Sequence, residues 1–382
     1  MELTSFAKRR IQTEMVVGVN LLSLRIEGGG TRHFAESLLL EFTSPPFNRR
    51  HLLLAFCLPE LEAHVKSLFA SAPNVSIVAI ESIDQIQRCS DLFDIYFCPL
   101  NALYPILKDR PSVACLMDIQ ERFMPENFTS AELELRATLY SSLVNESTIA
   151  CTISDFCKDS FIDKLGADPS AVQVVRLYPQ KRLLDAGSDP LPELSGPFIV
   201  YPANWYAHKN VKNLVTGYLA ARKHNGGLPR LVLVGHPLKE GNQWLSDLAE
   251  GDPSAKAILN LTEISADRLR WLYEKAEYVI LPTLFEGYCM PLAEAIVLGR
   301  PVLANDLPVM REIGGEWPVY RTLETSEQIC HAILEMETVD LGKSEMPLPP
   351  ALEGWNWTQI AFAYETIFNQ ALVKHRVTKA GR

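Results

Sequence analysis

Short apolar runs recur along this sequence and alternate with polar or amphipathic stretches long enough to form helices. Near-continuous apolar strands that alternate with helices are typical of a parallel sheet covered on both faces. In the first half of the chain, the runs predict strands over residues 15–22, 51–57, 75–80, 92–99, 112–117, 148–153 and 172–177. This pattern predicts an α/β fold.

One segment breaks the pattern. Residues 185–197 (DAGSDPLPELSGP) combine proline, glycine, serine and acidic side chains without periodicity, which is typical of a linker between domains. The alternation then restarts. Strands are predicted over residues 198–201, 231–234, 257–261, 278–281 and 301–304, and helices over 211–224, 242–250, 266–275 and 291–298.

The chain ends on an amphipathic segment, residues 357–372, whose apolar side chains follow helical spacing. The whole pattern predicts two doubly wound, Rossmann-like domains in tandem. The predicted limits are residues 1–184 for the first domain, 185–197 for the linker, 198–354 for the second domain and 355–382 for a C-terminal helix. Ligands of such sheets bind at the carboxyl ends of the strands.

Composition and charge narrow the kind of protein. Of the 382 residues, 47% are hydrophobic, which is enough for two cores, and the net charge of −10 disfavours nucleic acid as a partner. The sequence shows neither an apolar run of transmembrane length nor a signal peptide. We therefore expect a cytoplasmic protein. The basic cluster KRR at residues 8–10 is a hint of a peripheral contact with the inner face of a membrane.

Motifs for metal binding and for several common chemistries are missing from the sequence. The cysteines form no C-x-x-C pair, and the histidines form no H-E-x-x-H or H-x-H pattern. There is also no Asp-x-Asp, Walker A, G-x-G-x-x-G or G-x-S-x-G motif. We therefore expect neither a metal ion nor a cofactor.

The most informative segment is residues 281–295 (LPTLFEGYCMPLAEA). A strand ends, a glycine-bearing turn follows, and a helix is predicted to begin at about Pro291. Backbone amides at such a helix start form a cradle for an anion or a phosphate. The residues of this cradle are Gly287, Tyr288, Cys289 and Met290. Glu286 and Glu294 could face the same cleft, where carboxylates accept hydrogen bonds from sugar hydroxyls.

Two glutamates eight residues apart are, taken alone, more often a helix cap and an exposed residue, and the flanking residues decide the matter here. The segment resembles the E-x7-E signature of the retaining GT-B glycosyltransferases of family 4, with its Phe-Glu-Gly and Pro-Leu-x-Glu-Ala flanks. Residues 299–302 (GRPV) and 308–315 (PVMREIGG) resemble that family's next strand and loop. The resemblance implies that Glu294 binds ribose hydroxyls and that Glu286 binds hydroxyls of the donor sugar.

A second stretch, residues 201–210 (YPANWYAHKN), agrees with this resemblance. Lys209 could reach a diphosphate as a point charge, although a solvated lysine is the commoner case. The family usually places an arginine and a lysine here, five residues apart, and Asn204 replaces the arginine. This form resembles a subset that includes bacterial mannosyltransferases of surface-polysaccharide assembly, which favours GDP-mannose over UDP-sugars as the donor. His208 is suited equally to ordering the loop and to catalysis.

Further segments extend the resemblance to nearly the whole chain. Residues 261–265 (LTEIS), with Thr262 and Ile264, resemble the loop whose backbone meets the nucleotide base. Residues 152–158 (TISDFCK) resemble the family's S-x-x-S/C-K segment. Residues 355–372 resemble the terminal helix that crosses back to the first domain, although an ordinary surface helix would show the same periodicity.

Two places in the first domain complete the comparison. Residues 27–32 (EGGGTR), with Gly29 and Gly30, resemble the family's glycine-rich loop that faces donor and acceptor, whereas a glycine triplet alone is more often a flexible loop. Asp118 follows a predicted strand and lies at its carboxyl end. The family commonly has His-Asp there, and Met117 stands in place of the histidine.

The resemblance therefore implies a metal-independent, retaining hexosyltransferase, with Glu286, Lys209 and Asp118 at the reacting centre. It would move a hexose, with mannose favoured, from a nucleotide sugar to a glycan or lipid-linked acceptor in cell-surface polysaccharide synthesis. Three alternatives remain open: a transferase that uses a UDP-sugar, a phosphorylase or epimerase with the same cleft, and a catalytically weak binding or scaffold subunit. The last is motivated by Met117 and Asn204.

Overall fold

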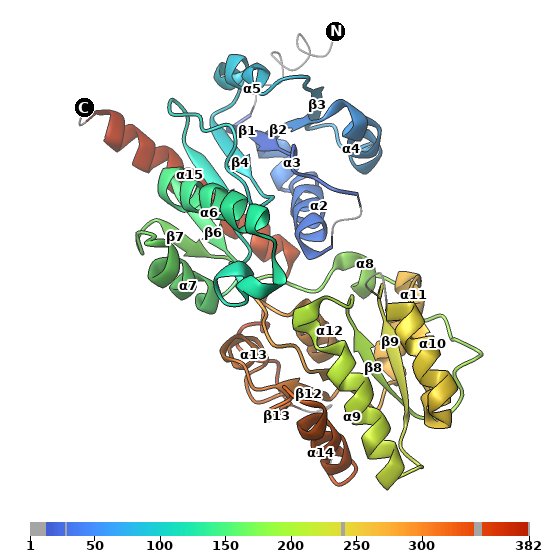
Figure 1. Cartoon of the computed structure of the whole chain (residues 1–382). Coiled ribbons are helices and arrows are strands. Elements are labelled where there is room, and N and C mark those ends of the chain that lie inside the picture. Colours follow the sequence, from blue (N-terminus) through green and yellow to red (C-terminus); the bar gives the residue numbers. More distant parts are fainter. Residues whose placement is uncertain (1–12, 27–28, 238–240, 340–345, 381–382) are drawn as a thin grey trace. The chain divides into compact units, whose positions relative to one another are not determined.

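The computed structural model describes residues 13–26, 29–237, 241–339 and 346–380 (Figure 1). The chain forms two compact units. The first unit combines residues 1–177 with residues 355–382, and the second comprises residues 178–354. Among the described residues, no helix combines the length and the apolar character needed to cross a membrane.

The first unit is built on a parallel sheet with the strand order β3-β2-β1-β4-β5-β6-β7. Its strands are β1 (Met15–Asn20), β2 (His51–Cys57), β3 (Val75–Ala79), β4 (Ile95–Cys98), β5 (Ser112–Cys115), β6 (Ile149–Thr152) and β7 (Val172–Val174). All seven predicted strands are confirmed. The central strands are buried along their full length, which is why they read as continuous apolar runs in the sequence.

Along the chain, the helices of the first unit alternate with these strands, except for the last helix, which follows the second unit. They are α2 (Gly30–Phe42), α3 (Phe47–Arg50), α4 (Glu62–Leu68), α5 (Asp84–Arg88), α6 (Ser130–Glu146), α7 (Asp155–Leu165) and α15 (Trp357–Ala380). Single 3-10 turns are η1 (Pro59–Leu61), η2 (Ser90–Leu92), η3 (Gln120–Arg122) and η4 (Pro125–Asn127).

Helix α15 follows the second unit in the chain but packs on the first unit, beside α2 and against β4 and β5 (Figure 1). Tyr364 and Phe368 place their rings 5.4 and 5.2 Å from the ring of Phe97. Glu365 pairs with the buried His51 at 2.6 Å. The predicted amphipathic helix is therefore confirmed, and its apolar face completes the first core.

The second unit has a parallel sheet with the strand order β10-β9-β8-β11-β12-β13. Its strands are β8 (Phe198–Pro202), β9 (Arg230–Val234), β10 (Ile258–Leu261), β11 (Tyr278–Leu281), β12 (Val302–Asn305) and β13 (Val319–Arg321). The five predicted strands are confirmed. The sequence analysis missed β13, because it is a three-residue edge strand that is only partly buried.

Helices cover this sheet on both faces. They are α8 (Lys181–Leu184), α9 (Val211–His224), α10 (Gly241–Gly251), α11 (Ala266–Lys275), α12 (Met290–Val297), α13 (Pro308–Gly314) and α14 (Ser326–Met336), with the 3-10 turns η5 (Ala207–Lys209) and η6 (Pro253–Ala257). The interpretation of residues 308–315 as a loop is wrong. Pro308 begins helix α13, where its missing amide hydrogen costs nothing, and Val309, Met310 and Ile313 are buried.

The predicted linker, residues 185–197, packs against helix α11 and lies within the second unit. The Gly187 amide donates to Asp267 at 2.5 Å, and Asp189 pairs with Arg268 at 3.1 Å. The boundary between the units lies after Leu177, upstream of the predicted limit at residue 184. The composition of this segment is that of a linker, but Gly187 and Asp189 bind side chains of helix α11.

Candidate functional site

The polar residues singled out in the second unit gather at one edge of its sheet. All six strands are parallel, so the loops that leave their carboxyl ends lie along the same edge. The loop after β8 carries Asn204, His208 and Lys209, and the loop after β11 carries Glu286. Strands β8 and β11 are neighbours in the sheet, which brings these two loops together.

Hydrogen bonds join the two loops directly. The Leu284 amide donates to the carbonyl oxygen of His208 at 2.7 Å, and the Thr283 hydroxyl is 3.2 Å from the same oxygen. The Thr283 hydroxyl also lies 2.9 Å from the carbonyl oxygen of Phe285. These contacts fix the register between the loops and place Lys209 beside Glu286.

Lys209 and Glu286, both predicted as reacting-centre residues, form an ion pair. Lys209 Nζ lies 2.5 Å from Glu286 Oε1, and their side chains are only 15% and 11% exposed. Tyr201 supports the lysine by donating its hydroxyl to the Lys209 carbonyl at 3.2 Å. Removing one member of a desolvated ion pair leaves an uncompensated charge, so each side chain depends on the other.

His208 contributes its backbone more than its charge. Burial and the neighbouring Lys209 lower the pKa of His208 to about 4, so its ring is neutral at pH 7. The ring stacks on Tyr206 with an interplanar angle of 7°. A neutral ring gives a phosphate no positive charge, whereas the His208 carbonyl accepts the hydrogen bonds that join the loops.

Helix α12 begins at this loop and points its amino end toward it. Cys289 precedes the helix with φ of 69° and ψ of 75°, a left-handed conformation that few side chains adopt. Burial and Glu286 raise the pKa of the Cys289 thiol, which therefore stays protonated and hydrogen-bonded to Glu286. The amino end of α12, with its partial positive charge, thus lies next to the Lys209–Glu286 pair.

Glu294 lies within α12 in a different environment from Glu286. Its side chain is 7% exposed, and the Tyr273 hydroxyl donates to Oε2 at 2.7 Å. Burial raises the pKa of Glu294 to about 7, while the Tyr273 hydrogen bond and the charge of Arg182 oppose that rise. The edge therefore offers one ion-paired carboxylate and one that titrates near neutral pH.

Comparison with known families addresses the second unit. Residues 189–328, which contain Lys209, Glu286 and Glu294, match the family described as glycosyl transferases group 1. The second unit carries a group 1 glycosyltransferase domain. The family resemblance of residues 281–295 is thereby confirmed.

Two relatives with similar sequences are mannosyltransferases by name. The chain is 23% identical over 248 residues to the O-antigen chain mannosyltransferase RfbU of Salmonella typhimurium, an alignment that covers 63% of this chain and 64% of the relative. It is 32% identical over 102 residues to the serotype-specific mannosyltransferase WbdA of Escherichia coli, which covers 27% of this chain and 12% of the relative.

A solved structure resembles the chain over nearly its whole length. The crystal structure of HepE from Anabaena, in complex with UDP-glucose, superposes with a TM-score of 0.66 at 14% identity, over 95% of this chain and all of HepE. At that identity the likeness concerns the fold. With its two parallel sheets, the chain has the GT-B fold of glycosyltransferases, as the sequence analysis predicted.

Asn204 joins two loops of the group 1 domain. Its Oδ1 accepts the His236 amide at 2.9 Å, and the Trp205 amide donates to the His236 carbonyl at 3.0 Å. Gly235 makes this approach possible, because a Cβ there would lie 2.5 Å from the carbonyl oxygen of Ala203. The sequence analysis places Asn204 on the diphosphate of the donor. In the structure, the side-chain oxygen of Asn204 accepts a backbone amide.

Thr262 and Ile264 leave the carboxyl end of β10, at the outer edge of the sheet. Thr262 is exposed and Ile264 is half-buried. The Gly235 amide donates to the Leu261 carbonyl at 2.9 Å, which ties this loop to the loop after β9. Three strand spacings, about 14 Å, separate β10 from β11, so a ligand that touches both loops must be extended.

The sequence analysis missed two buried asparagines behind the group 1 site. Asn305 donates to the Thr283 carbonyl and accepts the Leu323 amide, both at 2.8 Å. Asn210, with φ of 60°, donates to the Leu323 carbonyl at 2.8 Å. A signal was available, because each is a polar residue in an otherwise buried stretch at a strand or helix end.

In the first unit, Asp118 follows β5 and is half-buried, and its Oδ1 accepts the Gln120 amide at 3.1 Å. The Met117 amide donates to Asn101 Oδ1 at 2.9 Å. Gly29 precedes α2. Of the predicted glycine-rich loop, Glu27 and Gly28 lie outside the described residues, and a Cβ built on Gly29 or Gly30 meets nothing within 4 Å. Asp118 thus belongs to a different unit from Lys209 and Glu286.

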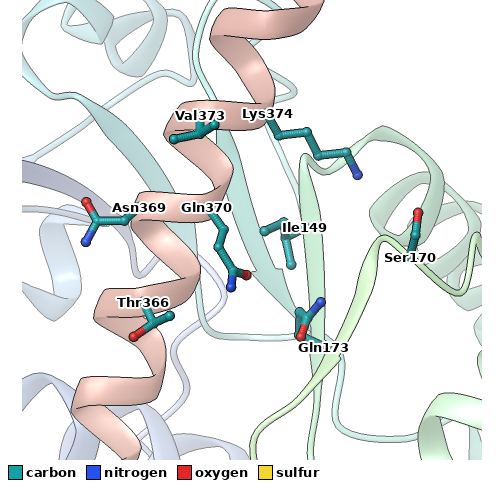
Figure 2. Close-up of a pocket in the computed structure, with 8 residues that line it drawn as sticks. All are labelled: Ile149, Ser170, Gln173, Thr366, Asn369, Gln370, Val373 and Lys374. Carbon is teal, nitrogen blue, oxygen red and sulfur yellow. The ribbon is translucent and has the colours of Figure 1, made fainter.

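The first unit also has a surface groove of about 570 Å³ beside α15 (Figure 2). Thr366, Gln370 and Lys374 of α15 line it, together with Ile149 and Gln173 of β6 and β7. Ile149 is the first residue of β6, so the groove extends toward the amino ends of the strands, whereas Asp118 follows the carboxyl end of β5. Within the described residues, no group of three or more His, Cys, Asp or Glu side chains is placed to hold a metal ion.

Proposed function

We propose that this protein transfers a hexose, with mannose favoured, from a nucleotide sugar, with GDP-mannose favoured, to a glycan or lipid-linked acceptor, with retention of configuration and without a metal ion. The observation that carries the proposal is the Lys209–Glu286 ion pair at the amino end of α12, in a matched group 1 domain. This places a cation, a strong acceptor and backbone amides together, which suits a sugar bound to a diphosphate.

In the proposed reaction, the bond between the anomeric carbon and the diphosphate oxygen breaks, and its electron pair stays on the diphosphate. A lysine ammonium has three donors, so Lys209 can keep Glu286 and still donate to the leaving oxygens. The amino end of α12 adds to this stabilisation. The acceptor hydroxyl forms the new bond, and its proton passes to the leaving diphosphate on the same face of the sugar.

The names of the relatives support mannose, since RfbU is an O-antigen chain mannosyltransferase and WbdA is a serotype-specific mannosyltransferase. The UDP-glucose complex of HepE supports the rival donor class, a UDP-sugar. A thermal-shift panel with GDP, UDP, ADP and dTDP distinguishes the two. A ligand at 100 times its Kd adds about 2.7 kcal/mol to the free energy of unfolding, which is enough to rank the four nucleotides.

We expect a shift with GDP, followed by release of GDP from GDP-mannose when a glycan acceptor is added. A shift in melting temperature with UDP alone would instead indicate a UDP-sugar as the donor. No shift with any nucleotide would overturn the proposal.

The Asn204 contact favours a second candidate, a binding subunit with weak catalysis. Its Oδ1 is held by the His236 amide, at the position where the family resemblance implies an arginine on the diphosphate. Such a subunit would bind nucleotide without releasing sugar, and Glu286→Gln would change nothing measurable. We expect instead that Glu286→Gln abolishes most donor turnover while nucleotide binding persists.

A further inference from the structure

Tyr273 and Glu294 form a buried contact between two helices of the group 1 domain. Tyr273 lies on α11 and is fully buried, and Glu294 lies on α12 with 7% of its surface exposed. The Tyr273 hydroxyl donates to Glu294 Oε2 at 2.7 Å. A buried carboxylate needs such a donor, because desolvation otherwise disfavours its charged form.

Two further ionisable groups act on this contact, each from a different place in the fold. Arg182 of α8 lowers the pKa of Glu294 through its charge, as the Tyr273 hydrogen bond also does, against the rise caused by burial. Cys289, before α12, acts electrostatically on Tyr273, and its own pKa is raised by burial. Loss of the Tyr273 hydroxyl would therefore raise the pKa of Glu294 further and reduce its ionised fraction at neutral pH.

We propose that Tyr273 is a positioning residue for nucleotide recognition: its hydroxyl fixes Oε2 of Glu294, so that Oε1 is presented to the ribose hydroxyls of the bound nucleoside diphosphate. This inference rests on the proposed function, in which Glu294 binds the ribose. It adds a residue that touches no ligand and acts through Glu294. This role depends on the hydroxyl of Tyr273, because a phenylalanine would fill nearly the same volume but could not donate a hydrogen bond.

A matched control lies five residues along the chain. Tyr278 is also buried, but its hydroxyl has no hydrogen-bond partner among the described residues. It is the first residue of β11, at the amino end of the strand, whereas the candidate site follows the carboxyl end. Tyr273→Phe and Tyr278→Phe therefore remove the same atom from the same kind of environment, and only the first removal affects Glu294.

The test measures the Kd of GDP and UDP, and of their 2′,3′-dideoxy forms, for the full-length parent and both variants between pH 6 and pH 9. We expect Tyr273→Phe to weaken binding of the ribose form about fivefold to tenfold at pH 7.0 and to leave the dideoxy form within twofold. The deficit should narrow at pH 9.0, where Glu294 is ionised in both proteins. Tyr278→Phe should match the parent throughout.

A Tyr273→Phe variant with the parental ratio of ribose to dideoxy affinity and the parental pH profile would overturn the positioning role. A parent that binds neither GDP nor UDP would overturn the proposed function itself, so the two failures are distinguishable. Glu294→Gln and the double variant guard against a general loss of folding. If Tyr273 acts through Glu294, Tyr273→Phe should change the ribose preference less than twofold in the Glu294→Gln background.

Discussion

The carboxyl edges of the two sheets differ in how they hold their charged groups. In the second unit, the Lys209 side chain pairs with that of Glu286 on the neighbouring loop, and the buried Asn305 binds the backbone of both Thr283 and Leu323. In the first unit, Asn101 also joins two loops by accepting the Met117 amide, but the charged Asp118 accepts the amide of Gln120, two residues away, in a local turn. The ion pair of the second unit is preorganised for a charged ligand, whereas the first unit offers a carboxylate on a short loop.

Lys209→Ala should have the largest effect, because it removes the cation of the second edge and leaves Glu286 unpaired at 11% exposure. We expect kcat/KM for the nucleotide sugar to fall roughly 30-fold to 1,000-fold, which corresponds to a loss of about 2–4 kcal/mol of transition-state stabilisation. Steady-state donor turnover measures this. Lys212→Ala is the matched control, since Lys212 is exposed one turn further along, on α9. A kcat/KM within threefold of the parent would remove Lys209 from the site.

The pH dependence of stability tests the second carboxylate of this edge. Burial raises the pKa of Glu294 from 4.5 to about 7, so the folded protein holds a proton that the unfolded chain has released between these values. The contribution of Glu294 to stability is therefore present below about pH 4.5 and is lost as the pH rises through 7. Between pH 5 and pH 8, the free energy of unfolding of the parent should fall by up to about 3 kcal/mol relative to that of Glu294→Gln.

Urea unfolding of the parent and Glu294→Gln at both pH values measures this difference. Glu263→Gln serves as the control, because Glu263 is exposed on the loop after β10. Parallel pH profiles for the parent and Glu294→Gln would contradict the buried environment of Glu294.

Asn305→Ala tests the ties between loops rather than the charges. It leaves the Thr283 carbonyl and the Leu323 amide without their partner in a place where the Asn305 side chain is only 3% exposed. We expect a loss of about 2 kcal/mol in the free energy of unfolding. Asn369→Ala, on the exposed surface of α15, is the control and should change it by less than about 0.5 kcal/mol. Equal effects of the two variants would show that Asn305 holds nothing.

Periodicity predicted the sheets well because buried parallel strands must be apolar along their length. It failed where an element is short or carries mixed polarity: β13 has three residues, and α13 begins with a proline that suggests a loop. Residues 185–197 resembled a free linker because their contacts, such as that of Asp189 with Arg268, join residues far apart in sequence. A pattern along the chain does not show which distant residue neutralises a charge.

The same limit applies to the candidate site. Glu286, Glu294 and Lys209 could be found because they belong to motifs with local spacing. Tyr273 and Asn305 could not, since their partners are 21 and 22 residues away and are reached through the packing of helices and loops. Asn204 shows the converse, a motif residue whose side-chain oxygen binds the His236 amide.

Asp118→Asn tests the first edge and should have the smallest effect. The substitution preserves an oxygen that can accept the Gln120 amide, so the turn should persist, while the negative charge is removed. If Asp118 serves the acceptor side, nucleotide affinity should stay within twofold, while transfer to acceptor should fall about tenfold, roughly 1.4 kcal/mol. Thermal shifts with nucleotide and transfer assays at saturating donor separate these quantities. A loss of nucleotide affinity equal to the loss of transfer would place Asp118 with the donor and erase the contrast between the two edges.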